Sequence, residues 1–355
     1  MTSRRIALAL TGAAAVLLAA LVIVPAATRP PTGLPPVGAA ELINSIHRAR
    51  SGPLSGTVHL DEQLGLAGFG GLSGMPSASR IARLWSDGAG RHRVSLPTDG
   101  GERTIVDDGA TVWSWDSATR SVIRRPAPAE HTPPDPLDRF LHTGGGDVGE
   151  LMGNPMDTAS AVLTMLEPSS SVRLDPTALV ADRPAYQLVL DPVPTERTLL
   201  REVRVAVDGQ TRLPLEVTVL ANGSAEPALR IGFSKLTFAP QDPALFAFAP
   251  GAGVTVRDHT SLISSVGPAT PDAGGHTESL VGQGWDTVLI RRVGTRAGAP
   301  PTASVAPPRL STPISGGWGH GRLVSTPIGN AVLTSDGRLA VGAVPAQVLT
   351  EALSR

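Results

Sequence analysis

The sequence predicts a mainly β protein of the α+β class, in which one large antiparallel sheet carries only a few helices. Most of the chain consists of short runs in which apolar side chains recur at every second position, as in strands with one buried face. Asp-Gly and Asn-Gly pairs separate several of these runs, and such pairs favour the tight turns of β-hairpins. Only three or so segments show helical spacing, so few helices are available to cover the sheet.

The first part of the chain predicts a short helix followed by a meander of hairpins. The helix is expected at 40–50, where Leu42, Ile43 and Ile46 recur at helical spacing. The following runs alternate in hydropathy and are joined by turn sequences. They cover Leu54–Leu60, Arg80–Trp85, Arg91–Leu96, Arg103–Asp107, Thr111–Trp115 and Ser121–Arg124.

The middle of the chain predicts two more helices before the strands resume. A short helix is expected at 137–142, and a longer one at 157–166 has an apolar face formed by Ala161, Val162, Met165 and Leu166. The strands that follow are expected at Tyr186–Leu190, Glu202–Val207, Leu215–Leu220 and Leu229–Phe238. Their alternation predicts a sheet with one apolar and one polar face.

The N-terminus predicts export. Arg4 and Arg5 precede an uncharged, mostly apolar run of 22 residues from Ile6 to Ala27. The positive residues favour the cytoplasmic side and direct the remainder outward. The run suits a cleaved signal peptide and also approaches the ~20 residues that span a bilayer, so a retained anchor is equally consistent with it.

Composition shifts divide the chain into five expected parts. Residues 1–27 are the signal peptide or membrane anchor, 28–39 a Pro-rich linker, 40–257 the main domain, 258–279 a second linker and 280–355 a β-rich C-terminal extension. The extension has strand-like runs at 285–291, 328–334 and 338–341 and a terminal helix at 345–353. Because the apolar alternation of the main sheet ends near Phe238, we expect the extension to be dispensable for ligand binding.

Charge and composition exclude several function classes. The 30 Lys and Arg residues nearly balance the 31 Asp and Glu residues, so no long-range field favours nucleic acid. The chain has no Cys, which excludes disulfides, thiol nucleophiles and thiolate metal sites. Its eight His residues lack metal-pair spacing, and GxSxG and SxxK motifs are absent. We therefore expect no metal, no cofactor and no enzyme activity.

The order of several short motifs resembles a known family. The segments AAELINSIHRA, LSGTVHL, GERTIVDDGATVWSWDSATRSV, RPAYQLVLDP, VRVAVDGQTRLPLEVTV and LRIGFSKLTFAPQDPALFAFAP follow one another between about Ala40 and Val256. In this order they resemble the actinobacterial LolA-like proteins, relatives of the lipoprotein carrier LolA and of the N-terminal domain of the sensor RseB. The resemblance implies a curved antiparallel half-barrel sheet, covered by a few helices, around an apolar cavity for acyl chains.

The candidate ligand-binding residues combine this resemblance with the strand period. The apolar phase of three successive strands supplies the expected cavity wall, namely Val203, Val205, Leu215, Val217, Ile231 and Phe233. Trp113 and Trp115 share one face of their strand, and the resemblance favours the cavity over packing beneath the extension. The Gly-rich segment 64–75 is either a flap over the cavity or a loop between strands, with Leu64, Leu66, Phe69 and Leu72 as its apolar side chains.

Two functions remain open from the sequence. The first is an extracytoplasmic, monomeric protein that holds lipid or lipoprotein acyl chains as a carrier or chaperone. The second is an RseB-like regulatory protein, in which the cavity senses a lipid and 280–355 contacts a membrane protein partner.

Overall fold

The computed structural model describes residues 33–62, 80–98, 100–127, 155–258, 279–292 and 311–355. The chain divides into two compact units, 1–33 and 34–355, and the elements below all belong to the second. The expected helix at 137–142 and the candidate flap residues lie outside the described residues. Among the described helices, none has the length and hydropathy required to cross a bilayer.

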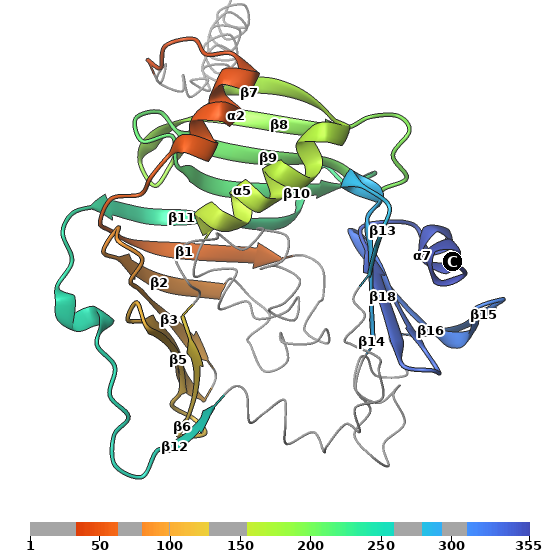
Figure 1. Cartoon of the computed structure of the whole chain (residues 1–355). Helices are drawn as coiled ribbons and strands as arrows, with labels where there is room; N and C mark the ends of the chain where they lie inside the picture. The colour runs from red at the N-terminus through yellow and green to blue at the C-terminus, as the bar shows by residue number, and fades with distance from the viewer. Residues whose placement is uncertain (1–32, 63–79, 99, 128–154, 259–278, 293–310) are drawn as a thin grey trace, which may run out of the picture. The chain divides into compact units, whose positions relative to one another are not determined.

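A large open sheet of twelve strands dominates the described chain (Figure 1). The predicted mainly β, curved sheet with few helices is therefore confirmed. Its strands are β1 (Leu54–Glu62), β2 (Arg80–Ser86), β3 (His92–Thr98), β4 (Gly101–Asp107), β5 (Thr111–Asp116), β6 (Ser121–Pro126), β7 (Ser170–Val180), β8 (Arg183–Pro192), β9 (Leu200–Asp208), β10 (Pro214–Ala221), β11 (Pro227–Phe238) and β12 (Thr255–Asp258).

Two meanders meet at the centre of this sheet. The strand order is β12-β6-β5-β4-β3-β2-β1-β11-β10-β9-β8-β7, so the first and last long strands pair with each other. Leu60 lies opposite Ile231 in this central antiparallel pair, and the register shifts between Thr57 and Val58. A further shift interrupts the β10–β11 pair. Such irregularities increase the local twist and bend the sheet.

Two helices lie on one face of the sheet, which we call the inner face; the opposite face is the outer face. Helix α2 (Ala39–Arg48) buries Leu42, Ile43 and Ile46, as its spacing predicts. Helix α5 (Pro155–Leu166) crosses β8, β9 and β10 in Figure 1. Its fully packed side chains are Ala159, Leu163 and Leu166, which recur at spacings of four and three.

The face of α5 differs from the predicted one. Of the four residues predicted to form it, only Leu166 is fully buried, whereas Ala161, Val162 and Met165 are half-buried. The buried face of α5 is therefore centred on Ala159 and Leu163 and is rotated about the helix axis from the predicted face. Ala159 is small and is completely buried, which brings the helix backbone close to its neighbours.

The chain after β11 crosses the outer face and returns to the far edge of the sheet. We call residues 239–258 the outer segment. Asp242 caps the 3-10 helix η4 (Pro243–Phe246) by accepting a hydrogen bond from the Ala244 amide at 2.9 Å. The segment ends as β12, which pairs with β6 in the one parallel pair of the described sheet. This pairing covers the hydrogen-bonding edge that β6 otherwise exposes.

The C-terminal residues form a second sheet of six strands. It contains β13 (Ser279–Val281), β14 (Val288–Arg292), β15 (Thr312–Gly316), β16 (Gly319–Thr326), β17 (Gly329–Thr334) and β18 (Arg338–Gly342), and helix α7 (Ala346–Leu353) packs on it. Before β14 the 3-10 helix η5 (Gly284–Asp286) replaces the start of the strand predicted at 285–291.

One side chain of the C-terminal part belongs to the core of the large sheet. Trp285 is 2% exposed, packs within that core and donates its indole N–H to Oγ of Ser170 at 2.8 Å. The Leu199 amide donates to the carbonyl oxygen of Ala343 at 2.9 Å. The extension therefore contributes packing to the main core, and its dispensability for ligand binding stays a prediction. The five-part division of the chain stays a prediction.

Strand β7 is the longest of the described strands that the sequence did not predict. It contains Pro176, and its register with β8 shifts between Asp175 and Ala178. Proline cannot donate a backbone hydrogen bond, and it is tolerated here because β7 is at the edge of the sheet. The same interruption hides the strand from a search for regular alternation.

Candidate functional site

The apolar wall predicted from the sequence forms on the inner face. Val203, Val205, Leu215, Val217, Ile231 and Phe233 all belong to one core cluster, and each is at most 4% exposed. Val217 lies opposite both Val205 and Ile231, which joins three strands across the sheet. The structure therefore brings these six residues together on one face.

Close packing accounts for their burial. Ala159, Leu163 and Leu166 of α5 belong to the same cluster as the six wall residues. Burying one Val, Leu, Ile or Phe side chain contributes about 1.5–3 kcal/mol, so this contact stabilises the domain. Where α5 covers the sheet, the inner face is consequently a packed core.

The apolar inner face continues beyond α5. Val58 lies opposite Phe233 on one side and Ala82 on the other, and Leu84 and Val94 are opposite each other in β2 and β3. Ile105 of β4 pairs with Val94 and extends the row by one more strand. The apolar side chains on β2, β3 and β4 therefore form a continuation of the wall past the strands over which Figure 1 draws α5.

Trp113 and Trp115 lie on the outer face, which differs from the predicted position in the cavity. Ile105 is an inner-face residue and pairs with Ser114, so the two neighbours of Ser114 point the other way. Both indoles are half-buried. The Trp113 ring lies 5.6 Å from the ring of Phe248 in the outer segment. The outer segment, and not the C-terminal extension, covers Trp113.

A carboxylate fixes the orientation of Trp113. Its indole N–H donates to Oδ2 of Asp108 at 2.9 Å, and the amides of Ala110 and Thr111 donate to Oδ1. Burial alone would raise the pKa of Asp108, but these three hydrogen bonds together hold the pKa below its usual value. The arrangement explains the Asp-Gly turn before β5 and holds the indole against the outer segment.

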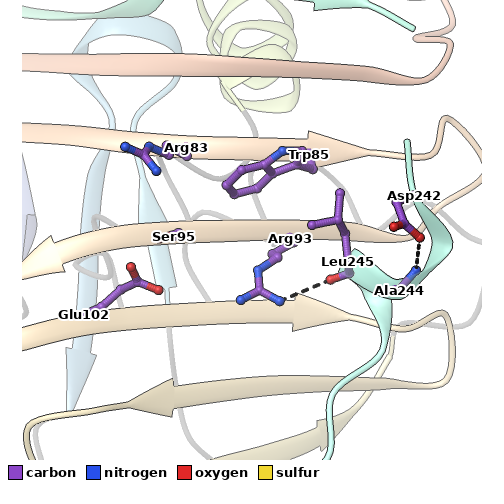
Figure 2. A pocket seen from close by; sticks show the side chains of 8 residues that line it. All are labelled: Arg83, Trp85, Arg93, Ser95, Glu102, Asp242, Ala244 and Leu245. Carbon is purple, nitrogen blue, oxygen red and sulfur yellow. Dashed lines mark hydrogen bonds between the residues drawn. The ribbon is translucent and has the colours of Figure 1, made fainter. Parts of the chain in front are cut away.

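A pocket that the sequence analysis missed lies between the outer face and the outer segment (Figure 2). It has a volume of about 390 Å³ and opens to solvent. We call it the outer pocket; its lining residues are Arg83, Trp85, Arg93, Ser95, Glu102, Asp242, Ala244 and Leu245.

Strand period and register assemble this pocket. Arg83 and Trp85 are two residues apart on β2, and they pair with Ser95 and Arg93 on β3. All four side chains consequently share the outer face. Nη1 of Arg93 donates to the carbonyl oxygen of Leu245 at 3.3 Å, which joins the sheet to η4. The alternating R-x-W and R-x-S signals were visible in the sequence, but η4 is about 150 residues away.

The outer face of β7 to β11 is charged and internally paired. Glu202 is 5% exposed and accepts from Nη2 of Arg173 at 3.0 Å and from Nε of Arg204 at 2.8 Å. Arg230 and Glu216 form another pair on the neighbouring strands, at 3.5 Å. These charges confirm the predicted polar face. Among the described residues, no group of three or more His, Asp or Glu side chains is arranged to hold a metal ion.

Comparison with known proteins gives structural neighbours only. No family model matches the chain, and no curated protein matches it. The MucB protein of Pseudomonas aeruginosa, in complex with MucA, is 19% identical, with 89% of this chain and 96% of that chain covered and a TM-score of 0.45. An uncharacterized conserved protein from Thermus thermophilus is 12% identical, with 62% and 98% covered and a TM-score of 0.37.

A LolA superfamily protein from Nitrosomonas europaea is 10% identical. The comparison covers 60% of this chain and 99% of that chain, with a TM-score of 0.25. The structural neighbours of this chain thus include LolA-superfamily and MucB proteins, at low identity and low TM-score.

Proposed function

We propose that the protein is an extracytoplasmic binder of lipid or lipoprotein acyl chains, acting as a carrier or chaperone. The observation that carries this proposal is the apolar inner face, which continues from the packed wall under α5 onto β2, β3 and β4. The opposite face of β7 to β11 is charged, so this part of the sheet separates an apolar surface from a polar one. The N-terminal run supports export.

We infer different roles for different parts of the inner face. The six wall residues pack against α5, so a ligand would have to displace the helix to reach them. On β2 to β4 the apolar row lies past the strands that α5 crosses. Ala82, Leu84 and Val94 are buried in the same cluster as the wall, and Ile105 is half-buried at the end of the row. We therefore infer that an acyl chain lies along β2 to β4, with the packed wall as the end of its site.

A pair of matched variants tests this assignment. Ile105→Trp places an indole on the inner face, whereas Ile81→Trp makes the same change on the outer face of β2, where Ile81 is 43% exposed. We expect Ile105→Trp to weaken uptake of a fluorescent fatty acid by about tenfold, because bulk in an apolar site excludes the chain. Ile81→Trp should bind as the unchanged protein does. Equal uptake by both variants, with both folded, would place the ligand elsewhere.

A regulatory role is the second candidate. On the face of the C-terminal sheet opposite α7, Leu289 lies between Leu280 and Val341 in register. Leu280 and Val341 are 43% and 39% exposed. An exposed apolar row of this kind favours a protein contact, here with a membrane protein. Photo-crosslinking from position 341 in native membranes should capture one partner, and added lipid should abolish the crosslink if lipid binding regulates the contact.

A further inference from the structure

The outer pocket holds two arginines whose donors face an open cavity. Arg83 is exposed and has no hydrogen bond or ion pair within the described part of the chain. To the described residues the Arg93 side chain makes one hydrogen bond, from Nη1 to the carbonyl oxygen of Leu245 at 3.3 Å. By contrast, nearby Arg91 is paired with Asp87, from Nε to Oδ2 at 2.6 Å. Figure 2 shows the Arg83 guanidinium turned away from Trp85 and the Arg93 guanidinium directed toward Leu245, with Glu102 and Asp242 toward opposite ends.

Two guanidiniums on different strands suit a phosphate better than a carboxylate. Each guanidinium can donate two parallel hydrogen bonds to a pair of oxygens. A carboxylate offers one such pair, whereas a tetrahedral phosphate offers separate edges to two donors. Arg83 and Arg93 occupy diagonal positions across the β2–β3 pair, since Arg83 lies opposite Ser95 and Arg93 opposite Trp85. Arg83 is exposed and unbonded within the described residues, so its side chain can turn toward Arg93, and a phosphate held between the two guanidiniums then contacts both.

The remaining lining residues select a positive group on the same ligand. Glu102 and Asp242 balance the charges of the two arginines, so the described lining has no formal excess of positive charge. Oε1 of Glu102 accepts from Thr104 at 2.8 Å, which orients its carboxylate. The Trp85 ring adds a π surface, which attracts a neighbouring ammonium. A free phosphate dianion interacts favourably with the two arginines but offers no positive group to Glu102, Asp242 or the Trp85 ring.

We propose that the outer pocket binds a zwitterionic phosphoester of the phosphoethanolamine type. The phosphate lies between Arg83 and Arg93, and the ammonium lies near Trp85 and an acidic side chain of the rim. This site is on the opposite face of the sheet from the inner apolar row, so one lipid molecule cannot fill both. The outer pocket and the acyl-chain site are therefore separate sites, and an experiment can disprove one without affecting the other.

Calorimetric titration of the full chain with O-phosphoethanolamine tests the proposal. We expect binding, about tenfold weaker in Arg83→Gln and in Arg93→Gln because each loses a charge-assisted contact. Arg257→Gln, at an exposed position of β12, is the matched control and should bind unchanged. Arg83 is exposed, so its variant should keep the circular dichroism spectrum of the unchanged protein. Unchanged affinity in both pocket variants would overturn the proposal.

A further variant tests the ammonium half. Glu102→Gln should weaken O-phosphoethanolamine several-fold, because only this ligand has an ammonium, and should not weaken inorganic phosphate, whose binding gains from the loss of a repelling carboxylate. Phosphate binding as tightly as O-phosphoethanolamine would contradict the zwitterionic assignment. Fatty-acid uptake measured on the same variants should be unchanged, which separates this site from the inner face.

Vesicles distinguish the source of the headgroup. Co-sedimentation with phosphatidylethanolamine vesicles, lost in Arg83→Gln, would identify the ligand as a membrane headgroup. Binding of O-phosphoethanolamine without sedimentation would identify it as a soluble phosphoester. Failure of both probes to bind would overturn the site.

Discussion

Asp208 illustrates how one residue in a turn becomes a determinant of stability. It is 1% exposed, and its two carboxylate oxygens accept from Nε and Nη2 of Arg183 at 2.7 and 3.0 Å. Thr211 donates both its amide and its hydroxyl to Oδ2 at 2.7 Å. Burial by itself would raise the pKa of Asp208, but the bonds from Arg183 and Thr211 together hold the pKa below its usual value.

We expect this pair to stabilise the fold above the ordinary Asp pKa of about 3.9 and to lose its contribution as the pH falls through the lower folded pKa. Asp208→Asn should reduce the free energy of unfolding by about 2–3 kcal/mol at pH 7, below the full value for a buried pair because Arg183 keeps some solvent contact. Urea unfolding at pH 7 and at pH 2 measures the difference.

The control is Asp191→Asn, which removes the more exposed partner of Arg173. This substitution should lower the free energy of unfolding by less than about 1 kcal/mol at either pH. A destabilisation by Asp208→Asn that stays constant down to pH 2 would show that lost packing, and not the charge, is responsible.

Val217 tests the packing of the inner face. It is 4% exposed and belongs to the cluster that includes α5, so Val217→Asp would bury a carboxylate without a partner. We expect a loss of several kcal/mol or complete unfolding, measured by thermal denaturation. Val256→Asp, at an exposed position of β12, should leave the midpoint nearly unchanged. A stable Val217→Asp protein that fails to take up fatty acid would instead mean that this wall lines a hydrated cavity.

At the scale of elements, a few side-chain and backbone contacts attach the outer segment to the large sheet. Phe246 of η4 is 2% exposed, and the guanidinium of Arg91 lies 5.4 Å from the centre of its ring. Further along, Nη2 of Arg120 donates to the carbonyl of Ala252, and β12 follows. The pocket and the added edge strand therefore depend on one connection across the sheet.

Phe246→Ala should loosen this connection. We expect a loss of about 3–5 kcal/mol if the site cannot collapse, with the amides of β12 exchanging hydrogen sooner than those of β1 and β11. Hydrogen exchange read by mass spectrometry provides the measurement. Phe248→Ala removes a half-buried ring and should have a smaller effect. Uniformly faster exchange over the whole sheet would show that η4 and β12 do not open as a unit.

At the scale of the whole molecule, the two sheets share one tryptophan. Truncation after Asp258 removes Trp285 from the core of the large sheet. We expect a lower thermal midpoint than that of the full chain, since a large apolar contact is lost. Trp285→Phe should cost less, because it keeps most of the ring and loses chiefly the hydrogen bond to Ser170, worth about 1 kcal/mol. A truncated protein as stable as the full chain would contradict the contribution of Trp285 to the core of the large sheet.

The sequence by itself determined the local features of this protein. The α2 spacing, the alternation in β9, β10 and β11, and the mainly β class follow from periods of 3.6 and 2 within single segments. The six wall residues were found together for the same reason. The alternation of Arg83 with Trp85 placed these two side chains on one face of β2, although it did not identify which face.

Only the tertiary structure decided which faces meet. Trp113 and Trp115 share a phase that is clear within β5, but their assignment to the outer face depends on the register of every pair from β11 to β5. The outer pocket, the parallel pairing of β12 and the place of Trp285 likewise join residues far apart in the chain. A period of two specifies relative orientation along one strand, whereas the absolute face depends on long-range pairing, which the local sequence does not encode.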